Sequence, residues 1–153
     1  MLTSSNEESL HLHENEFKNI LAAHQQWLRS EGKEGQQAHL DGVILRGANL
    51  KGVNLQRANL TLACLEGANL ENADLQGCTL ILASLKEANL TNARLRGADL
   101  NSCKLQAADL QGADLSAANL EWTDLSYANL YQTNLRGANL DNANLNNALG
   151  VSP

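Results

Sequence analysis

The sequence predicts a solenoid, a repetitive fold in which the chain turns a corner every five residues around an apolar interior. Leucine occupies every fifth position from Leu40 to Leu145, which makes 22 consecutive leucines in one register. A small residue lies two positions before each leucine, and it is alanine in 16 of the 22 repeats. Asparagine or aspartate directly precedes the leucine in 15 repeats. An uninterrupted short period of this kind determines the architecture of the whole segment.

A period of five residues fits neither regular element. An α-helix has about 3.6 residues per turn, so the leucines would spiral around it and bury on no single face. In an extended strand, successive leucines would point to opposite faces. The leucines stay inside only if the chain bends once in each repeat. Glycine supports such turns because it tolerates positive φ, and it lies two positions after the leucine in eight repeats: Gly42, Gly47, Gly52, Gly67, Gly77, Gly97, Gly112 and Gly137.

The repeat unit resembles the signature of the pentapeptide repeat family, as in Ala58-Asn59-Leu60, Ala98-Asp99-Leu100 and Ala138-Asn139-Leu140. The resemblance extends over residues 38–148. It implies an all-β solenoid, namely a right-handed quadrilateral β-helix with four pentapeptides per coil and about five and a half coils for 22 repeats. Many members of the family have no assigned function, so the resemblance implies a shape more than an activity.

The pattern divides the chain into five segments. We expect a flexible polar tail (1–13), a capping α-helix (14–31), a connecting turn (32–37), the pentapeptide-repeat β-helix (38–149) and a short tail (150–153). The N-terminal tail is polar and its apolar residues show no clear period. The connecting turn is rich in glycine, but it lacks the glycine spacing of a phosphate-binding loop.

The helix is predicted from an apolar stripe with helical spacing that begins at residue 17. Glu14 and Glu16 near its start and Arg29 near its end suit the helix dipole. An open solenoid end exposes unpaired backbone, so we expect the helix to cap the first coil. The alternative is a helix that docks on a partner. His24 is interpreted as flanking the core of the cap, not as a catalyst, and that core comprises Phe17, Ile20, Leu21, Trp27 and Leu28.

The outward positions contain two apolar features. If residues 20 apart stack, then Leu62, Ile81 and Leu82 lie on adjoining coils, and Trp122 lies on the same side two coils further along. Aromatic residues surround the fifth coil, and such residues often anchor interfaces. For the apolar patch the alternatives are cover from the N-terminal tail or chance, and for the aromatic residues the alternative is shielding of the prism edges. The predicted protein-contact surface comprises Leu62, Ile81, Leu82, Trp122, Tyr127 and Tyr131.

The charge pattern argues against a nucleic-acid binder. The net charge is −6, and the chain from residue 38 onward carries 11 acidic and eight basic residues, a balance of −3. Direct binding of nucleic acid would need a concentrated basic surface. No long apolar run is present, so we expect neither a signal peptide nor a membrane span.

The residue types that carry catalysis or bind metals form no recognisable site. His11 and His13 have no third ligand nearby in the sequence, so a metal site is not predicted. Cys64, Cys78 and Cys103 lack paired spacing, which favours a reduced, cytoplasmic protein. Cys78 and Cys103 occupy the inner small position, whereas Cys64 points outward. We therefore expect no enzyme activity and no cofactor.

Three functions remain open at this point. The main hypothesis is a non-enzymatic protein-binding or scaffold module, because a rigid solenoid can vary its outer residues freely. The resemblance implies an alternative, because some family members mimic DNA in shape and charge and modulate DNA gyrase; the weak charge and the missing C-terminal dimer helix disfavour it. The third is a structural or regulatory role without a fixed ligand. After Leu145 the register breaks and no capping helix follows, so this end could pair with a second copy as a homodimer or an end-to-end stack, or the chain could be a fragment of a longer protein.

Overall fold

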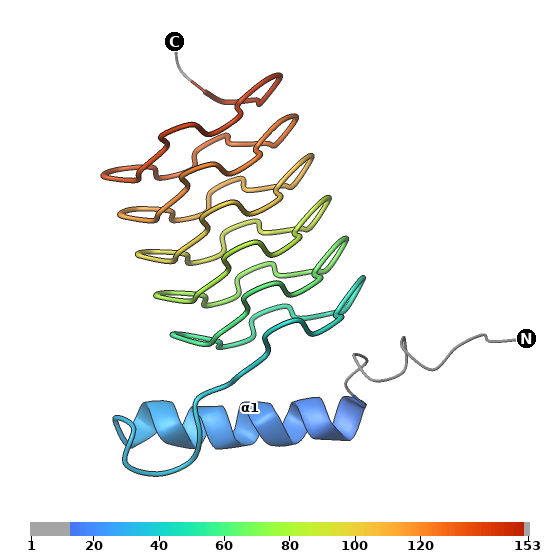
Figure 1. Cartoon of the computed structure of the whole chain (residues 1–153), viewed down its shortest axis with the longest axis vertical. Coiled ribbons are helices and arrows are strands. Elements are labelled where there is room, and N and C mark those ends of the chain that lie inside the picture. Colours follow the sequence, from blue (N-terminus) through green and yellow to red (C-terminus); the bar gives the residue numbers. More distant parts are fainter. Residues whose placement is uncertain (1–12, 152–153) are drawn as a thin grey trace, which may run out of the picture.

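The computed structural model describes residues 13–151. It contains a helix, α1 (Glu14–Arg29), followed by a stack of coils along one axis. Figure 1 shows α1 lying across the first coil, with the rest of the chain rising away from it. The predicted polar tail lies outside the described residues except for His13, which precedes α1, and so do the last two residues of the short C-terminal tail.

The coils repeat every 20 residues, which is four pentapeptides. Parallel β-bridges join residues 20 apart, from His39 with Asn59 to Asn129 with Leu149. The bridged residue is always the one before the leucine position of its repeat, so equivalent repeats stack directly on one another. Each side of a coil is too short for an extended strand because the chain turns again after three residues. The predicted solenoid of stacked pentapeptides is confirmed.

The backbone amides of a repeat are paired within the repeat and with the adjoining coils, as the residues around Leu60 illustrate. The N–H groups of Leu60 and Leu62 donate to carbonyls of the next coil at 2.7 and 2.9 Å, and that of Asn59 donates to the previous coil at 3.0 Å. The Ala63 N–H closes the turn on the Leu60 carbonyl at 3.0 Å. The Thr61 N–H donates to Asn59 Oδ1 at 3.1 Å. All five amides of the repeat are thus paired, as buried backbone requires.

The last of these bonds explains the preference for asparagine or aspartate before the leucine. In all 15 repeats with such a residue, its Oδ1 accepts the N–H of the residue two positions later. This is the local side-chain-to-backbone bond that short polar residues make at turns. In the other seven repeats, which carry other residues at this position, the described residues form no such bond.

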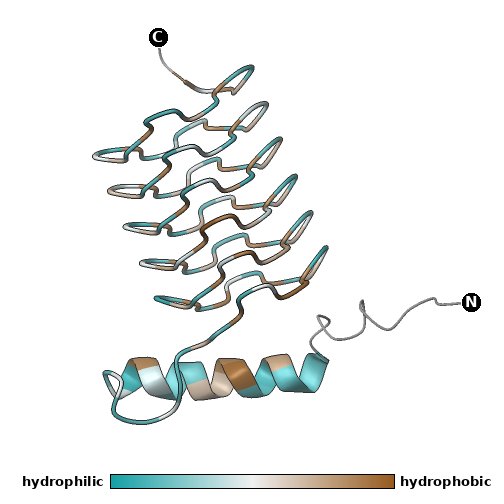
Figure 2. Cartoon of the chain, viewed as in Figure 1, coloured by the Kyte–Doolittle hydropathy of each residue, from teal (hydrophilic) through white to brown (hydrophobic). Residues whose placement is uncertain are grey.

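The leucines and the small residues fill a narrow, continuous core. Leu60, Leu80 and Leu120 have no exposed surface, and alanines such as Ala83 are equally buried. This narrow interior accounts for the low aromatic content of 3%. Figure 2 shows hydrophobic residues recurring at regular positions along the coils. In the last repeats the inner residues are only partly buried, and these are Leu135, Ala138, Leu140, Leu145 and Ala148.

Every turn has the same backbone conformation. The second residue after each leucine has φ between +55° and +71°, whether it is one of the eight predicted glycines or one of 14 other residues. Positive φ at this one position of a four-residue turn is the pattern of a type II turn, which favours glycine. For other L-residues the left-handed conformation costs roughly 1–2 kcal/mol. The fold therefore requires positive φ at this position of every turn, but only eight of the 22 turns have glycine there.

Helix α1 packs one side on the first coil. Phe17, Ile20 and Leu21 are partly buried against the core. The Glu16 carboxylate accepts the His13 N–H at 3.1 Å and so closes the first turn of the helix. The chain then folds back under α1 at Gly35, which has φ +75° and where a Cβ would lie 2.6 Å from the Trp27 nitrogen. Only glycine fits this approach, which explains the glycine at position 35 of the connecting turn.

Candidate protein-contact edge

Each coil turns four corners, and the stacked turns form four straight edges of the solenoid. Each edge carries the two residues that follow the leucines at one corner. Edge 1 follows Leu40 and the leucines at 20-residue intervals from it, and edges 2, 3 and 4 follow Leu45, Leu50 and Leu55 in the same way. Edge 1 therefore consists of the residue pairs 41–42, 61–62, 81–82, 101–102, 121–122 and 141–142.

Edge 1 brings together four of the six residues predicted to contact a partner. Leu62, Leu82 and Trp122 are 60%, 52% and 59% exposed. Ile81 is half-buried, and its carbonyl accepts the Leu62 N–H at 2.9 Å, so the two residues lie side by side on adjoining coils. Trp122 lies on the same edge, separated from the leucines by the turn that contains Ser102.

The apolar area extends to two residues that the sequence analysis did not include in the surface. Ile44 and Cys64 occupy the position before the leucine on the side next to edge 1, and they are half-buried and bridged to each other. Asparagine or aspartate fills this position in most repeats. The absence of asparagine or aspartate at positions 44 and 64 is the sequence feature that could have identified these two residues.

Tyr127 and Tyr131 are exposed, but the structure does not join them to this cluster. They are 65% and 53% exposed. Tyr127 lies on edge 2 and Tyr131 on edge 3, so together with Trp122 they occupy three successive corners of one coil. The aromatic residues therefore point in different directions, and edge 1 is the part of the predicted surface with several neighbouring apolar side chains.

The charges of edge 1 have one sign. Its turn positions and the polar positions on the side that leads into it contain four carboxylates and neither lysine nor arginine: Asp41, Asp99, Glu121 and Asp141. The side that leaves edge 1, which carries Ile44 and Cys64, also contains Lys104 and Asp124. Edge 4, at the neighbouring corner, carries Arg57, Arg96 and Arg136 and no acidic residue. Edges 2 and 3 are mixed and contain the ion pairs of Arg46 with Glu66 at 2.9 Å and of Lys51 with Glu71 at 3.0 Å.

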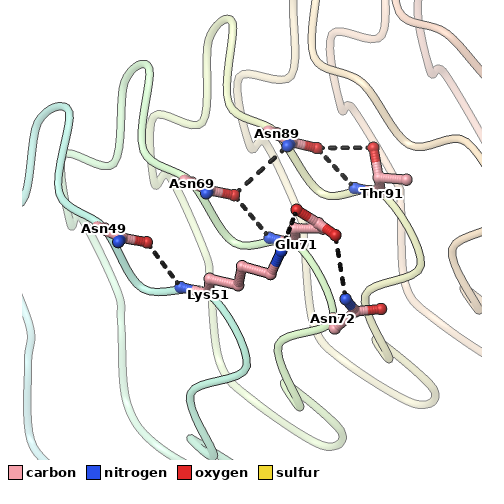
Figure 3. A network of polar contacts seen from close by, with 7 residues as sticks. All are labelled: Asn49, Lys51, Asn69, Glu71, Asn72, Asn89 and Thr91. Atoms are coloured by element: carbon pink, nitrogen blue, oxygen red, sulfur yellow. Dashed lines mark hydrogen bonds and ion pairs between the residues drawn. The ribbon is translucent and has the colours of Figure 1, made fainter.

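Polar residues elsewhere on the surface are occupied by bonds within the solenoid. Figure 3 shows Asn49, Asn69 and Asn89 stacked on successive coils, with Lys51 reaching Glu71 on edge 3. Asn69 Oδ1 accepts both the Glu71 N–H at 3.1 Å and Asn89 Nδ2 at 3.4 Å. On another side, hydrogen bonds from the Ser116 side chain and backbone hold the pKa of Asp114 below its usual range. These groups stabilise turns, and their arrangement indicates a structural role.

His24 is fully buried, although the sequence analysis placed it at the flank of the core. Its Nδ1 accepts the Ala38 N–H at 3.1 Å, and its ring stacks on Trp27 at 5.7 Å between centroids. The Arg57 guanidinium lies 4.7 Å from the centroid of the Trp27 ring. Burial lowers the pKa of His24, and the Gln56 backbone offsets part of this effect. His24 thus joins α1 to the first coil, and Trp27 and Leu28 are half-buried beside it.

The cysteines and acids form no reactive cluster in the described part of the chain. No group of three or more His, Cys, Asp or Glu side chains between residues 13 and 151 could hold a metal ion. Cys78 and Cys103 are buried, and burial raises the pKa of Cys78 to about 12. Cys64 is half-exposed, with its Sγ 3.8 Å from Arg46 Nη2. Helix α1 is too short and too polar to cross a membrane, and the described residues contain no other helix that could.

Comparisons with known proteins agree with this architecture. The family model for pentapeptide repeats matches eight copies over residues 36–67, 63–101 and 113–149. The chain is similar to the pentapeptide repeat protein Rfr23 from the cyanobacterium Cyanothece 51142, with 27% identity over 84% of this chain and 98% of that one and a TM-score of 0.50. It is also similar to alr5209, a pentapeptide repeat protein from Nostoc PCC 7120, with 29% identity over 77% and 96% of the two chains and a TM-score of 0.59. A comparison with curated proteins returns no significant match.

Proposed function

We propose that this chain, which belongs to the pentapeptide repeat family, is a non-enzymatic, cytoplasmic protein-binding module that contacts a protein partner through edge 1. The solenoid would act as a rigid scaffold. Its core and its backbone bonds are satisfied by the inner positions of each repeat, which leaves the outer positions free to be selected for contact. Its titratable groups recur at the outer positions of the repeats, and the surface hollow that Arg46, Glu66, Lys86 and Glu87 line contains the ion pair of Arg46 with Glu66.

One observation carries this proposal, namely bulky apolar residues in exposed turns that favour glycine. Leu62, Leu82 and Trp122 have φ of +61°, +59° and +59°. Each accepts an unfavourable backbone conformation of roughly 1–2 kcal/mol and leaves most of its side chain in water. Tyr127 is the only other large hydrophobic residue at this position of the turn. Local strain that stability does not explain is characteristic of functional positions.

The test is affinity capture from the lysate of the source cell. The binding variant carries serine at four edge 1 positions, Leu62→Ser, Ile81→Ser, Leu82→Ser and Trp122→Ser. The matched control carries Tyr127→Ser and Tyr131→Ser, which also removes exposed hydrophobic residues but from edges 2 and 3. We expect a partner that the wild type and the control capture and the edge 1 variant does not. Capture by all three proteins, or loss in the control alone, would contradict the assignment to edge 1.

The gyrase-modulator alternative finds no support among the described residues. A mimic of duplex DNA needs extended negative charge, whereas edge 4 carries Arg57, Arg96 and Arg136. A supercoiling assay with purified gyrase separates the two functions. We expect unchanged gyrase activity when the protein is added at micromolar concentration, and inhibition or drug protection would favour the alternative.

A further inference from the structure

We propose that the partner of edge 1 presents an amphipathic helix whose apolar stripe is flanked by lysine or arginine residues. This inference rests on the proposed function and specifies the chemistry of the partner. It follows from three properties of edge 1: its linear apolar spacing, its mostly paired backbone amides and the one sign of the charges at its turns.

The spacing of edge 1 suits the side chains of a helix. Stacked strands lie about 4.8 Å apart, so Leu62 and Leu82 follow each other at about that distance along the edge. An α-helix advances about 5.4 Å per turn. Apolar residues three or four positions apart on a helix that runs along the edge would therefore meet successive coils, and two further turns of the helix would approach Trp122, which lies two coils beyond Leu82.

The backbone of edge 1 offers little to an added β-strand. The N–H groups of Thr61, Asn101 and Glu121 already donate to asparagine or aspartate side chains at 3.1, 3.1 and 3.2 Å. The N–H groups of Leu62 and Trp122 donate to the next coil at 2.9 and 3.0 Å. Thr79 offers no such acceptor to the Ile81 N–H, but strand addition requires a whole row of free main-chain groups. A partner on this edge must therefore bind through side chains, which favours a helix.

The charges of edge 1 favour a basic partner. Asp41, Glu121 and Asp141 lie on the edge itself, and the side chains of Asp41 and Asp141 are exposed. Among the described residues none of these three is part of an ion pair. The arginines of edge 4 would repel a basic helix from the neighbouring corner. Complementary charges of this kind set the orientation and the specificity of an interface more than its affinity.

The test uses synthetic peptides as defined probes. The first contains leucine and lysine, with the leucines at helical spacing. The second replaces lysine with glutamate, and the third scrambles the order of the first. Binding to the full chain is measured by the fluorescence anisotropy of labelled peptide, at low salt because exposed charges are screened at high salt.

Two variants of the protein probe the two kinds of contact. Leu62→Gly with Leu82→Gly removes apolar side chains at positions where the backbone itself favours glycine, so the variant is expected to fold. Asp41→Asn, Glu121→Gln and Asp141→Asn together remove three charges from edge 1. The charge control, Glu66→Gln, Glu71→Gln and Glu87→Gln, removes three charges from edges 2 and 3 and so changes the net charge equally. Asp99 is left intact because its Oδ1 accepts the Asn101 N–H.

The expected result is binding of the ordered leucine–lysine peptide, weakened about tenfold by either edge 1 variant and little changed by the charge control. Equal binding of the glutamate peptide would overturn the basic character of the partner, and equal binding of the scrambled peptide would overturn the helix. Equal weakening in the charge control would mean general attraction to an acidic protein. If these tests fail while the lysate partner is still lost in the edge 1 serine variant, the proposed function stands and only the partner chemistry is wrong. If no lysate partner depends on edge 1, the proposed function itself fails.

Discussion

Edges 1 and 4 are neighbouring corners of the same coils. Both require positive φ at the second residue after the leucine, but they carry different residue types there. At the second residue after the leucine, edge 4 has glycine at Gly77, Gly97 and Gly137 among its five turns. Edge 1 has one glycine among its six turns, and three of the others carry large apolar side chains. The φ values at this position are positive and similar on both edges, from +56° to +67° on edge 1 and from +56° to +71° on edge 4. Stability alone therefore does not explain the composition of edge 1.

The two edges also differ in what they contact. Arg57 of edge 4 lies over Trp27 of α1, and its carbonyl accepts a hydrogen bond from Gln37 of the connecting turn. The base of edge 4 is therefore part of the junction with the helix. No described residue from α1 or the connecting turn forms a hydrogen bond or an ion pair with edge 1. The comparison suggests that edge 4 serves the fold, whereas edge 1 is available to a partner.

The largest effect should come from the core that both edges share. Leu80 is fully buried on the side between edges 4 and 1. Leu80→Ala should lower the free energy of unfolding by about 2–5 kcal/mol, because it leaves a cavity in the middle of the stack. Leu82→Ala, two residues away on edge 1, should change it by less than about 0.5 kcal/mol. Urea denaturation measures both, and similar losses would show that Leu82 is a core residue and would remove the contrast between the edges.

The next effect concerns the junction at the base of edge 4. Burial lowers the pKa of His24 from 6.5, so the folded protein holds this residue neutral where the unfolded chain begins to bind a proton. The stabilisation is complete above about pH 6.5 and is lost as the pH falls through the lower pKa of the folded state. Protonation would also place an N–H at Nδ1 opposite the Ala38 N–H. We expect the free energy of unfolding to fall between pH 7 and pH 5, as followed by denaturation at several pH values.

A variant isolates His24 from other titrating groups. Asparagine at this position, His24→Asn, can keep an acceptor for the Ala38 N–H but does not titrate. The variant should lose the pH dependence in this window, whereas His39→Asn at an exposed position should keep it. The same pH dependence in His24→Asn and the wild type would assign the effect to another group. The carboxylates with lowered pKa, such as Asp114, lose their contribution only at more acidic pH.

Exchange of residues between the edges tests the comparison directly. Leu62→Gly with Leu82→Gly should raise the free energy of unfolding by about 1–2 kcal/mol, because glycine relieves the left-handed strain at both residues and loses about 0.5–1 kcal/mol of this gain per residue to its greater backbone entropy in the unfolded chain. The reverse change on edge 4, Gly97→Leu, should lower it by about 1 kcal/mol, although a Cβ there has no neighbour within 4 Å. Thermal and urea unfolding measure both changes. If the edge 1 glycines destabilise the protein instead, the leucines contribute to the fold and their exposure needs no partner.

The fold could be predicted from the sequence because every repeat makes the same contacts, within itself and with the two adjoining coils. The leucine register, the small inner residues and the turn glycines all describe contacts within one or two coils, so a local pattern was enough. His24 could not be placed in the same way. Its burial depends on the bend at Gly35 and on contact with the first coil, which the helical stripe alone does not encode. The placement of Tyr127 and Tyr131 around the fifth coil, away from Leu62 and Leu82, could be predicted because it follows from the repeat number alone.

The smallest effect should come from the polar position that leads into edge 1. Asn119 Oδ1 accepts the Glu121 N–H at 3.2 Å. Thr79 occupies the same position two coils earlier and makes no such bond to Ile81. Asn119→Ala removes the bond to the Glu121 N–H, worth about 0.5–1.5 kcal/mol, together with the bonds of the Asn119 side chain to Asp99 Oδ1 at 3.0 Å and Asn139 Nδ2 at 3.4 Å. Thr79→Asn should stabilise the protein by about 0.5–1.5 kcal/mol or less through the turn bond. Hydrogen exchange at the Glu121 and Ile81 amides measures each bond separately from global stability.

These two changes also bear on edge 1 as a binding surface. Thr79→Asn would fix the turn that carries Ile81 and Leu82 without changing either apolar side chain. If the partner binds a preformed edge, the variant should keep its affinity or improve it slightly, since the turn is ordered before binding. If affinity falls while the Ile81 amide becomes protected, the turn must rearrange to bind. Edge 1 would then differ from edge 4 in mobility as well as in composition.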